Sequence, residues 1–205
     1  MLELDHIAVA GATLPEATEA VETALGIRLQ PGGQHDVFGT HNTLLGLEDG
    51  LYLEAIAADP SAPKPSRPRW FDLDNFSGPA RLTNWICRTD DMAGMLAQLP
   101  PGLGAPVALR RGALRWDMAV TEDGTLPYDN LHPTLIQWRG AAHPATMLAP
   151  SGCRLCRLVV AHPRALELRA TLAPFLHDDR VVYEPGDAPA LQATFDTPHG
   201  TRVLQ

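Results

Sequence analysis

The chain has few cysteines, an excess of acidic over basic residues and no long apolar run. Its 205 residues include three cysteines, an odd number without a disulfide framework, so reduced thiols are expected. Sixteen basic against twenty-four acidic side chains give a formal net charge of -8, which argues against nucleic acid and membrane surfaces as partners. The first residues do not begin a signal peptide, and no segment approaches a membrane span. We therefore expect a cytoplasmic protein.

Several catalytic motifs are missing as well. The sequence has no G-x-S-x-G, no Walker loop, no G-x-G-x-x-G after a strand and no H-E-x-x-H, so hydrolase triads, kinases and dinucleotide enzymes lack support. One C-x-x-C occurs, at Cys153 and Cys156, within a segment that alternates like a strand. A strand would place the two sulfurs on opposite faces, which favours ordinary cysteines over a zinc or redox site.

The sequence does contain an order of strand and helix signals that returns about every 60 to 70 residues. In the first module, residues 1–58, Thr13 is expected to cap a helix that Gly26 ends. The Gly32-Gly33 pair is expected to turn the chain. The expected elements are a strand over 4–10, a helix over 14–25, strands over 43–47 and 51–57, and a further strand if 28–30 also pairs.

A proline-rich segment over 59–79 is expected to be a linker or a crossing loop. Two further modules follow it. The second, 80–140, is expected to contain strands over 81–88, 107–110, 114–121 and 134–138 and a helix over 90–99. The third, partial module, 151–205, is expected to contain strands over 155–161, 180–183, 191–196 and 201–204 and a helix over 164–176.

These modules predict an α+β fold in which repeated βαββ(β) units form a cupped mixed sheet. One βαββ unit leaves an open sheet face, and two can form a cup between them in which a small molecule would bind. The third module would then cover an edge, pair with another subunit or build a second, smaller sheet. A homodimer is one of these options.

Some segments of the sequence are typical of a known family: Leu4–Ala10, Leu25–Ile27, Gly39–Leu45 and Leu51–Ala57 in the first module, and Leu82–Arg88 and Leu135–Trp138 in the second. They resemble the corresponding segments of glyoxalase-like proteins of the vicinal oxygen chelate superfamily. The resemblance implies a cupped sheet and a superfamily that includes metal-dependent isomerases, lyases and ring-cleaving dioxygenases, together with metal-free antibiotic-binding proteins. Such a resemblance predicts the fold of a chain more reliably than its function.

In the metal-using members an imidazole and a carboxylate on the first and last strands of a module face the cup. His6 and Glu54 stand at the matching positions, so the resemblance implies that they bind a divalent metal such as Zn, Ni, Mn or Fe. Period-two alternation places His6 on one strand face with Leu4 and Ala8. A carboxylate at Glu54 would be costly to bury without a cation or a hydrogen-bond donor beside it.

The second module departs from this pattern. Asn84 stands where the counterpart of His6 is expected, and Gln137 falls near the counterpart of Glu54. Neutral amides are weak ligands for transition metals, which puts metal catalysis in doubt. Together with Tyr52, these amides could instead line a pocket and hydrogen-bond a polar ligand.

Other candidates lie in loops and in the second module. His35 and His41 flank a glycine-containing loop that could close over the cup, where His41 could carry a proton and His35 could line the pocket. The segment Arg115-Trp116-Asp117 could hold an anion, although alternation separates Trp116 from its neighbours. Trp138 is expected to pack a helix against the sheet, and the remaining histidines are assigned no role.

Two hypotheses follow. The first is an enzyme in which a metal on His6 and Glu54 polarises a small oxygenated substrate, with lyase, isomerase or dioxygenase chemistry. The second is a metal-free protein that binds or sequesters a small molecule in the same cup.

Overall fold

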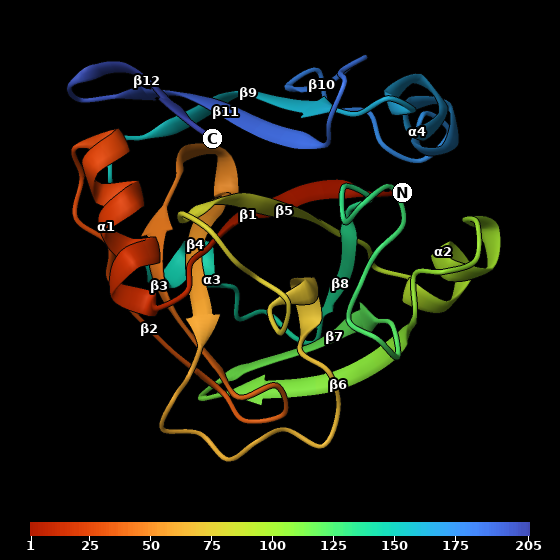
Figure 1. The fold of residues 1–205 in the computed structure, drawn as a ribbon, viewed down its shortest axis with the longest axis horizontal. Helices are drawn as coiled ribbons and strands as arrows, with labels where there is room; N and C mark the ends of the chain where they lie inside the picture. The colour runs from red at the N-terminus through yellow and green to blue at the C-terminus, as the bar shows by residue number, and fades with distance from the viewer.

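The structure is a computed structural model that describes all 205 residues, and its largest feature is an eight-stranded sheet in the order β2-β3-β4-β1-β5-β8-β7-β6 (Figure 1). The strands are β1 (Glu3–Ala10), β2 (Gln30–His35), β3 (Thr40–Gly46), β4 (Tyr52–Ala58), β5 (Arg81–Arg88), β6 (Ala105–Arg111), β7 (Leu114–Val120) and β8 (Thr134–Trp138). A short 3-10 turn, η1 (Glu48–Gly50), joins β3 to β4. The predicted α+β fold with a cupped mixed sheet is confirmed.

The sheet is built from two modules of the same βαβββ plan, one on each side of the central β1-β5 pair. In the first module α1 (Leu14–Leu25) follows β1, and in the second α2 (Met92–Gln98) follows β5. The first strand of each module runs parallel to the last strand of the same module, and β1 and β5 run antiparallel to each other. The two modules are therefore related by an approximate two-fold axis through the middle of the sheet.

Helix α1 forms where its end signals predict. The Thr13 hydroxyl accepts a hydrogen bond from the backbone N–H of Glu16 at 3.3 Å, and Gly26 ends the helix with φ 73°. Ala17 and Val21 are buried on one face of the helix, against the back of the sheet. This back face belongs to the larger of two apolar cores, and the inside of the cup holds the smaller one.

A β-bulge at Asp5 changes the expected alternation of β1. The register pairs Leu4 with Cys87 and His6 with Ile86, so Asp5 is an extra residue in the strand. Leu4 and Cys87 belong to the core behind the sheet, whereas His6 faces the cup. The prediction that His6 and Leu4 share a face is therefore wrong, because a bulge breaks the two-residue period.

The sheet curls until its two edge strands, β2 and β6, approach each other. The Gly32-Gly33 pair, predicted as a turn, instead lies within β2. A Cβ atom at Gly32 would collide with the Asn42 side-chain oxygen, and one at Gly33 would lie 2.6 Å from Arg111 Cδ. Glycine in this strand thus leaves room for two cup side chains, which a period-based prediction does not detect.

The third module forms a separate four-stranded sheet in the order β10-β9-β11-β12. Its elements are β9 (Arg154–Ala161), α4 (Ala165–Leu172), β10 (Val181–Glu184), β11 (Ala190–Thr197) and β12 (Gly200–Leu204). In Figure 1 this blue sheet lies across the red and olive strands β1 and β5, and its apolar residues join the core behind the large sheet. Three arrangements were possible for this module, and the structure shows that it builds a second, smaller sheet.

Two connecting segments complete the chain. The loop over 59–79 contains a 3-10 turn, η2 (Trp70–Asp72), that inserts Trp70 and Phe71 into the core of the cup. The connection from β8 to β9 contains α3 (Pro144–Met147). No helix has the length and apolar character needed to cross a membrane.

Candidate functional site

The cup holds a small cavity of about 20 Å³ beside His6, which is room for about one water molecule. We call this side of the cup its first half, and the side of Asn84 its second half. Both modules and the 59–79 loop contribute to the wall of this cavity. The lining residues are His6, His35, Asn42, Tyr52, Glu54, Trp70, Phe71, Arg111, Trp116, Met118, Ile136 and Trp138.

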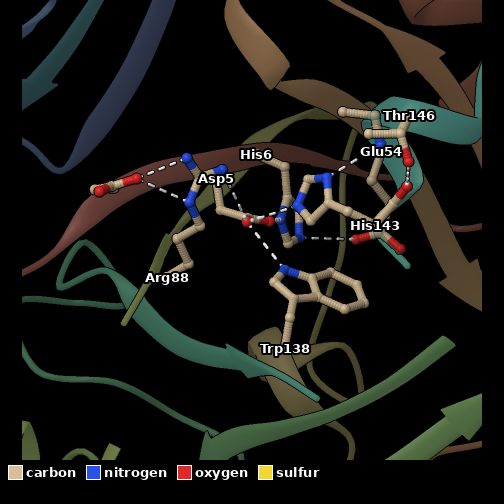
Figure 2. Close-up of polar contacts among 9 residues, drawn as sticks. Asp5, His6, Glu54, Arg88, Trp138, His143 and Thr146 are labelled. Atoms are coloured by element: carbon tan, nitrogen blue, oxygen red, sulfur yellow. Dashed lines mark hydrogen bonds and ion pairs between the residues drawn. The ribbon is translucent and has the colours of Figure 1, made fainter. Parts of the chain in front are cut away.

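The centre of the site is a contact between neighbours in β1. His6 Nδ1 lies 2.6 Å from Asp5 Oδ1, and both side chains are buried (Figure 2). An ionised carboxylate only accepts, so the Nδ1–H of His6 donates this bond. The bulge makes the contact possible, because successive residues of a regular strand point to opposite faces. His6 Nε2 is thereby left for the cavity.

Asp5 is held as an anion by further donors. Its Oδ2 accepts from Trp138 Nε1 and from His143 Nε2, both at 3.0 Å, as the dashed lines in Figure 2 show. The guanidinium of Arg88 lies 3.8 Å away. Burial raises the pKa of Asp5, but the hydrogen bonds from His143 and His6 outweigh it and hold the pKa well below its usual range.

Glu54 faces His6 across the cavity. Its Oε2 lies 3.8 Å from His6 Nε2, and its Oε1 accepts a short hydrogen bond from the side-chain amide of Asn42. The Asn42 oxygen accepts in turn from Gly33 N–H at 2.8 Å and from Arg111 at 3.1 Å. The expectation that a donor must accompany a buried Glu54 is confirmed by Asn42.

Arg111 connects the two edges of the curled sheet. From the end of β6 its Nη1 lies 3.1 Å from His35 Nε2 on β2. Burial, with the charge of Arg111 beside it, lowers the pKa of His35 to about 3, so this imidazole is neutral and its Nε2 accepts from Arg111. His35 Nδ1–H then donates to the Thr40 hydroxyl at 3.0 Å. The cavity thus contains a fixed guanidinium and a neutral histidine.

Tyr52 stacks on His6, with ring centroids 4.2 Å apart and ring planes 15° from parallel. Burial and the nearby charges of Asp5 and Glu54 raise the pKa of Tyr52 well above its ordinary value, so its phenol stays protonated. The stacked ring limits the rotation of the imidazole, which helps to keep Nε2 directed at the cavity.

The side chains around this cavity do not complete a metal site. His6 Nε2 and Glu54 Oε2 are two donors 3.8 Å apart, but no group of three or more His, Cys, Asp or Glu side chains gathers anywhere in the chain to hold an ion. Catalytic metal sites in proteins usually have three protein ligands. The guanidinium of Arg111 lines the same cavity and would repel a divalent cation. The residues present therefore do not fit the metal that the resemblance implies.

Four of the residues singled out from the sequence come together here: His6, Glu54, Tyr52 and His35. His41 does not join them. It follows Thr40 and precedes Asn42 in β3, and because Asn42 faces the cavity, His41 faces the opposite side, where its Nδ1 lies 4.0 Å from Asp59. The proton-carrying role expected for His41 has no geometric support.

Gln137 is also directed away from the cup. Its Oε1 accepts from Met92 N–H at 3.0 Å and its Nε2 donates to the Asp90 carbonyl at 2.9 Å, so it holds the start of α2. The register explains the difference. Ala8 pairs with Glu54 in the first module and Ile86 pairs with Thr134 in the second, which makes Thr134 the counterpart of Glu54.

Asn84 is buried on the cup face of β5, as expected for the counterpart of His6. It does not line the same cavity. It borders a larger one of about 580 Å³, and Phe71 is the one residue common to both walls. The η2 turn thus separates the cavity around His6 from this second compartment, which lies at the start of β5 between the 59–79 loop, the segment before β8 and the third module.

Sequence reasoning missed Asp5, Asn42 and Arg111. It assigned no role to His143 and expected Trp138 to pack a helix against the sheet. An acidic residue directly before a histidine in a buried strand is a signal that could have identified Asp5. Nothing local indicates Arg111, because its contacts depend on the closure of β2 onto β6.

Arg115, considered as an anion clamp, is exposed and donates to the backbone carbonyls of Gly112 and Leu114. Its neighbour Asp117 bonds to Arg139, so that of the segment Arg115-Trp116-Asp117 only Trp116 lines the cavity.

Solved structures are similar to this chain. A hypothetical protein from Staphylococcus aureus is 14% identical with a TM-score of 0.62, covering 93% of this chain and 88% of that one. A methylmalonyl-CoA epimerase from Mycobacterium tuberculosis is 23% identical with a TM-score of 0.42, covering 68% and 88%. A variant of the Streptomyces coelicolor methylmalonyl-CoA epimerase, in complex with 2-nitronate-propionyl-CoA, is 18% identical with a TM-score of 0.39, covering 68% and 97%.

No curated protein matches the chain significantly. A family model does match it, over residues 4–176, which span the cup and the start of the third module. The two βαβββ modules, the shared cup and this match agree, and the chain belongs to the glyoxalase-like domain family.

Proposed function

We propose that the first half of the cup is the active site of an enzyme that moves a proton on a small oxygenated substrate, with His6 as the general base. The observation that carries this proposal is the bond of 2.6 Å between His6 and the buried carboxylate of Asp5. A carboxylate that accepts Nδ1–H fixes the tautomer of an imidazole and stabilises the imidazolium formed when Nε2 takes a proton.

In the proposed step, His6 Nε2 takes a proton from a carbon next to a carbonyl. The electron pair of the broken C–H bond forms an enolate, whose negative oxygen lies toward Arg111. This guanidinium keeps further N–H donors beyond those bound to His35 and Asn42. The proton then returns to the same carbon or to a neighbouring atom, and His6 is neutral again. Glu54, 3.8 Å from Nε2, stabilises the intermediate imidazolium.

The substrate must be small and must displace part of the wall, because the cavity of about 20 Å³ holds little more than a water molecule. Trp70 and Phe71 come from a loop rather than from the sheet, so they form the part of the wall that can give way at the lowest cost. The carbonyl compounds that suit the site carry an oxygen for Arg111 and an acidic hydrogen for His6.

Metal-free binding without chemistry is the second candidate. It is favoured by the aromatic surfaces of Tyr52, Trp116 and Trp138, which line the cavity and offer stacking as well as polar contacts.

The test is hydrogen exchange in heavy water, followed by proton NMR on pyruvate, 2-oxobutyrate and dihydroxyacetone. The intact chain should exchange a proton of one of these compounds faster than a protein-free control. His6→Ala should reduce the rate by about 100-fold or more, and His41→Ala, which alters the other face of β3, should leave it unchanged. Equal rates in the native chain and His6→Ala would overturn the proposal.

A second part of the experiment distinguishes the metal-free from the metal-dependent mechanism. The same assay is run after dialysis against a chelator, with metal content measured by plasma mass spectrometry. The donor set predicts an unchanged rate and substoichiometric metal. A rate that disappears and returns with Zn, Ni, Mn or Fe would favour the metal-dependent candidate on His6 and Glu54. Saturable binding without any exchange would favour the binding protein.

A further inference from the structure

The second half of the cup contains a buried polar side chain without a partner. Asn84 is 1% exposed, and neither its amide nitrogen nor its oxygen has a hydrogen-bond partner within the protein. Buried amides are nearly always satisfied, and leaving one unpaired is costly. Thr134, the counterpart of Glu54, also has a buried hydroxyl without a partner, but it lines a different cavity, of about 10 Å³, beside Trp70 and Phe71. Asn84 thus has hydrogen-bonding capacity that the chain itself does not use.

Asn84 borders a cavity of about 580 Å³, a volume typical of small-molecule sites, and because its amide atoms are covered in the free protein, a ligand reaches them when the wall formed by the 59–79 loop gives way. The wall combines elements that are distant in sequence. Phe71 and Phe76 come from the 59–79 loop, Leu131 precedes β8, and Leu191 belongs to the third-module sheet. This cavity is separate from the one around His6, so a ligand here would not touch the proposed base.

The wall is polar but not cationic. Asp72 and Asp129 contribute two carboxylates. The one basic residue, Arg81, lies over the Phe76 ring at 4.4 Å and donates to the backbone carbonyls of Ser77 and Pro79. A phosphate or carboxylate ligand would meet two carboxylates and one guanidinium, so the net charge of the wall opposes an anion. The charges favour an uncharged ligand.

The backbone around the compartment is held in an uncommon conformation. Phe71, Asp72, Tyr128, Asp129 and Asn130 all have positive φ values, between 53° and 69°. Hydrogen bonds fix these turns: Asn75 donates to Asp72 at 2.6 Å, and Leu126 N–H donates to Asn130 at 2.8 Å. Such strain costs stability in the free protein, so a movement of the η2 turn that admits a ligand is opposed less than the movement of an unstrained segment would be.

We propose that this compartment is a second ligand site, which binds an uncharged planar heterocycle through Asn84. A carboxamide presents a donor and an acceptor side by side, and its complement is a ring with an N–H next to a C=O, as in a nucleobase or a lactam. The Phe71 ring and the face of the Phe76 ring that Arg81 does not cover provide flat apolar surfaces for such a ring. The volume accommodates a nucleobase or a nucleoside, and the two carboxylates disfavour a nucleotide.

The test uses uracil as the probe, titrated into the intact chain and followed by calorimetry and by ligand-observed NMR. Uracil should bind saturably. The matched probe 1,3-dimethyluracil, which lacks the N–H donor, should bind at least about tenfold more weakly. Asn84→Leu should weaken uracil binding by a similar factor. Gln98→Leu, the same kind of change on the exposed face of α2, should have no effect.

Equal affinity for the two probes, equal affinity in Asn84→Leu, or no saturable binding of uracil up to its solubility limit would each overturn the proposal. The comparison of the two probes needs no variant, so it decides the question even if Asn84→Leu does not fold. The exchange assay on His6 reports on the other compartment, so the failure of one proposal is distinguishable from the failure of the other.

Discussion

The two halves of the cup have the same strand plan, but they differ in how their buried polar groups are satisfied. In the first half the side chains of His6, Asn42 and Glu54 have no fully buried polar atom without a partner, and the unpaired atoms on that side, Trp70 Nε1 and His41 Nε2, lie outside this network. In the second half Asn84 and Thr134 are buried and unpaired. The register makes Thr134 the counterpart of Glu54, so the difference lies in the side chains and not in the backbone.

This difference suggests two uses of one scaffold. A connected network holds His6 in one orientation, which general-base chemistry requires. An unpaired group next to a large cavity costs stability in the free protein and gains hydrogen bonds when a ligand enters. The insertion of Phe71 between the compartments lets the two halves differ without interference.

The largest effect is expected from removing the carboxylate of Asp5, on which the arrangement of the first half depends. Asp5→Ala would leave the donors of His6, Trp138 and His143 without their acceptor. Breaking such a buried arrangement should lower the free energy of unfolding by about 3 to 5 kcal/mol, measured by urea denaturation. Glu3→Ala, two residues earlier and exposed, should cost less than about 1 kcal/mol.

Should Asp5→Ala fail to fold, Asp5→Asn retains the shape and removes the charge, and a smaller loss is expected from it. A change below about 1 kcal/mol in both variants would mean that Asp5 does not organise the first half.

The frame of the molecule follows from local signals in the sequence. Helix α1 has the predicted bounds because Thr13 and Gly26 mark its ends, and β5 and β8 have theirs because turns flank short apolar runs. The bulge at Asp5 could not be predicted, since it depends on the register against β5. The turn predicted at Gly32-Gly33 is wrong, because these residues lie within β2 and a glycine pair indicates a turn unless the neighbouring side chains are known.

The candidate site likewise has a part that the sequence predicts and a part that it does not. The sequence predicts four residues of the pocket from their polar or aromatic character, and all four line the cavity: His6, Glu54, Tyr52 and His35. Arg111 belongs to the site only because β6 curls back onto β2, a contact between residues 76 positions apart. Long-range closure of this kind has no periodic signature.

The second prediction concerns pH and involves one histidine from each half. Burial, with the charge of Arg111 beside it, lowers the pKa of His35 to about 3, and burial lowers the pKa of His132 to about 4. Both are lower than the unfolded value of about 6.5, so the unfolded chain binds more protons between these limits, and stability falls as the pH falls. From pH 7 to pH 5 each histidine should account for a loss of about 2 kcal/mol in the free energy of unfolding.

Urea denaturation at a series of pH values measures this loss. His35→Gln and His132→Gln should each reduce the dependence on pH, whatever they do to stability at pH 7. His177→Gln, the same substitution at an exposed histidine, serves as the control. A double variant that keeps the full pH dependence would show that neither imidazole is buried in its neutral form.

The smallest effect tests the comparison most directly, because it makes the same substitution in both halves. Asn42→Leu should lower the free energy of unfolding by about 1 to 3 kcal/mol, since it leaves Glu54 without its hydrogen-bond donor and removes one of the two acceptors of Arg111. Asn84→Leu removes an amide that has no partner, so it should be neutral or stabilising by about 1 kcal/mol. Thermal and urea denaturation of the two variants side by side gives the difference. Equal destabilisation by both would mean that Asn84 is already satisfied in the free protein, for example by bound water, and that the two halves of the cup are more alike than their side-chain contacts indicate.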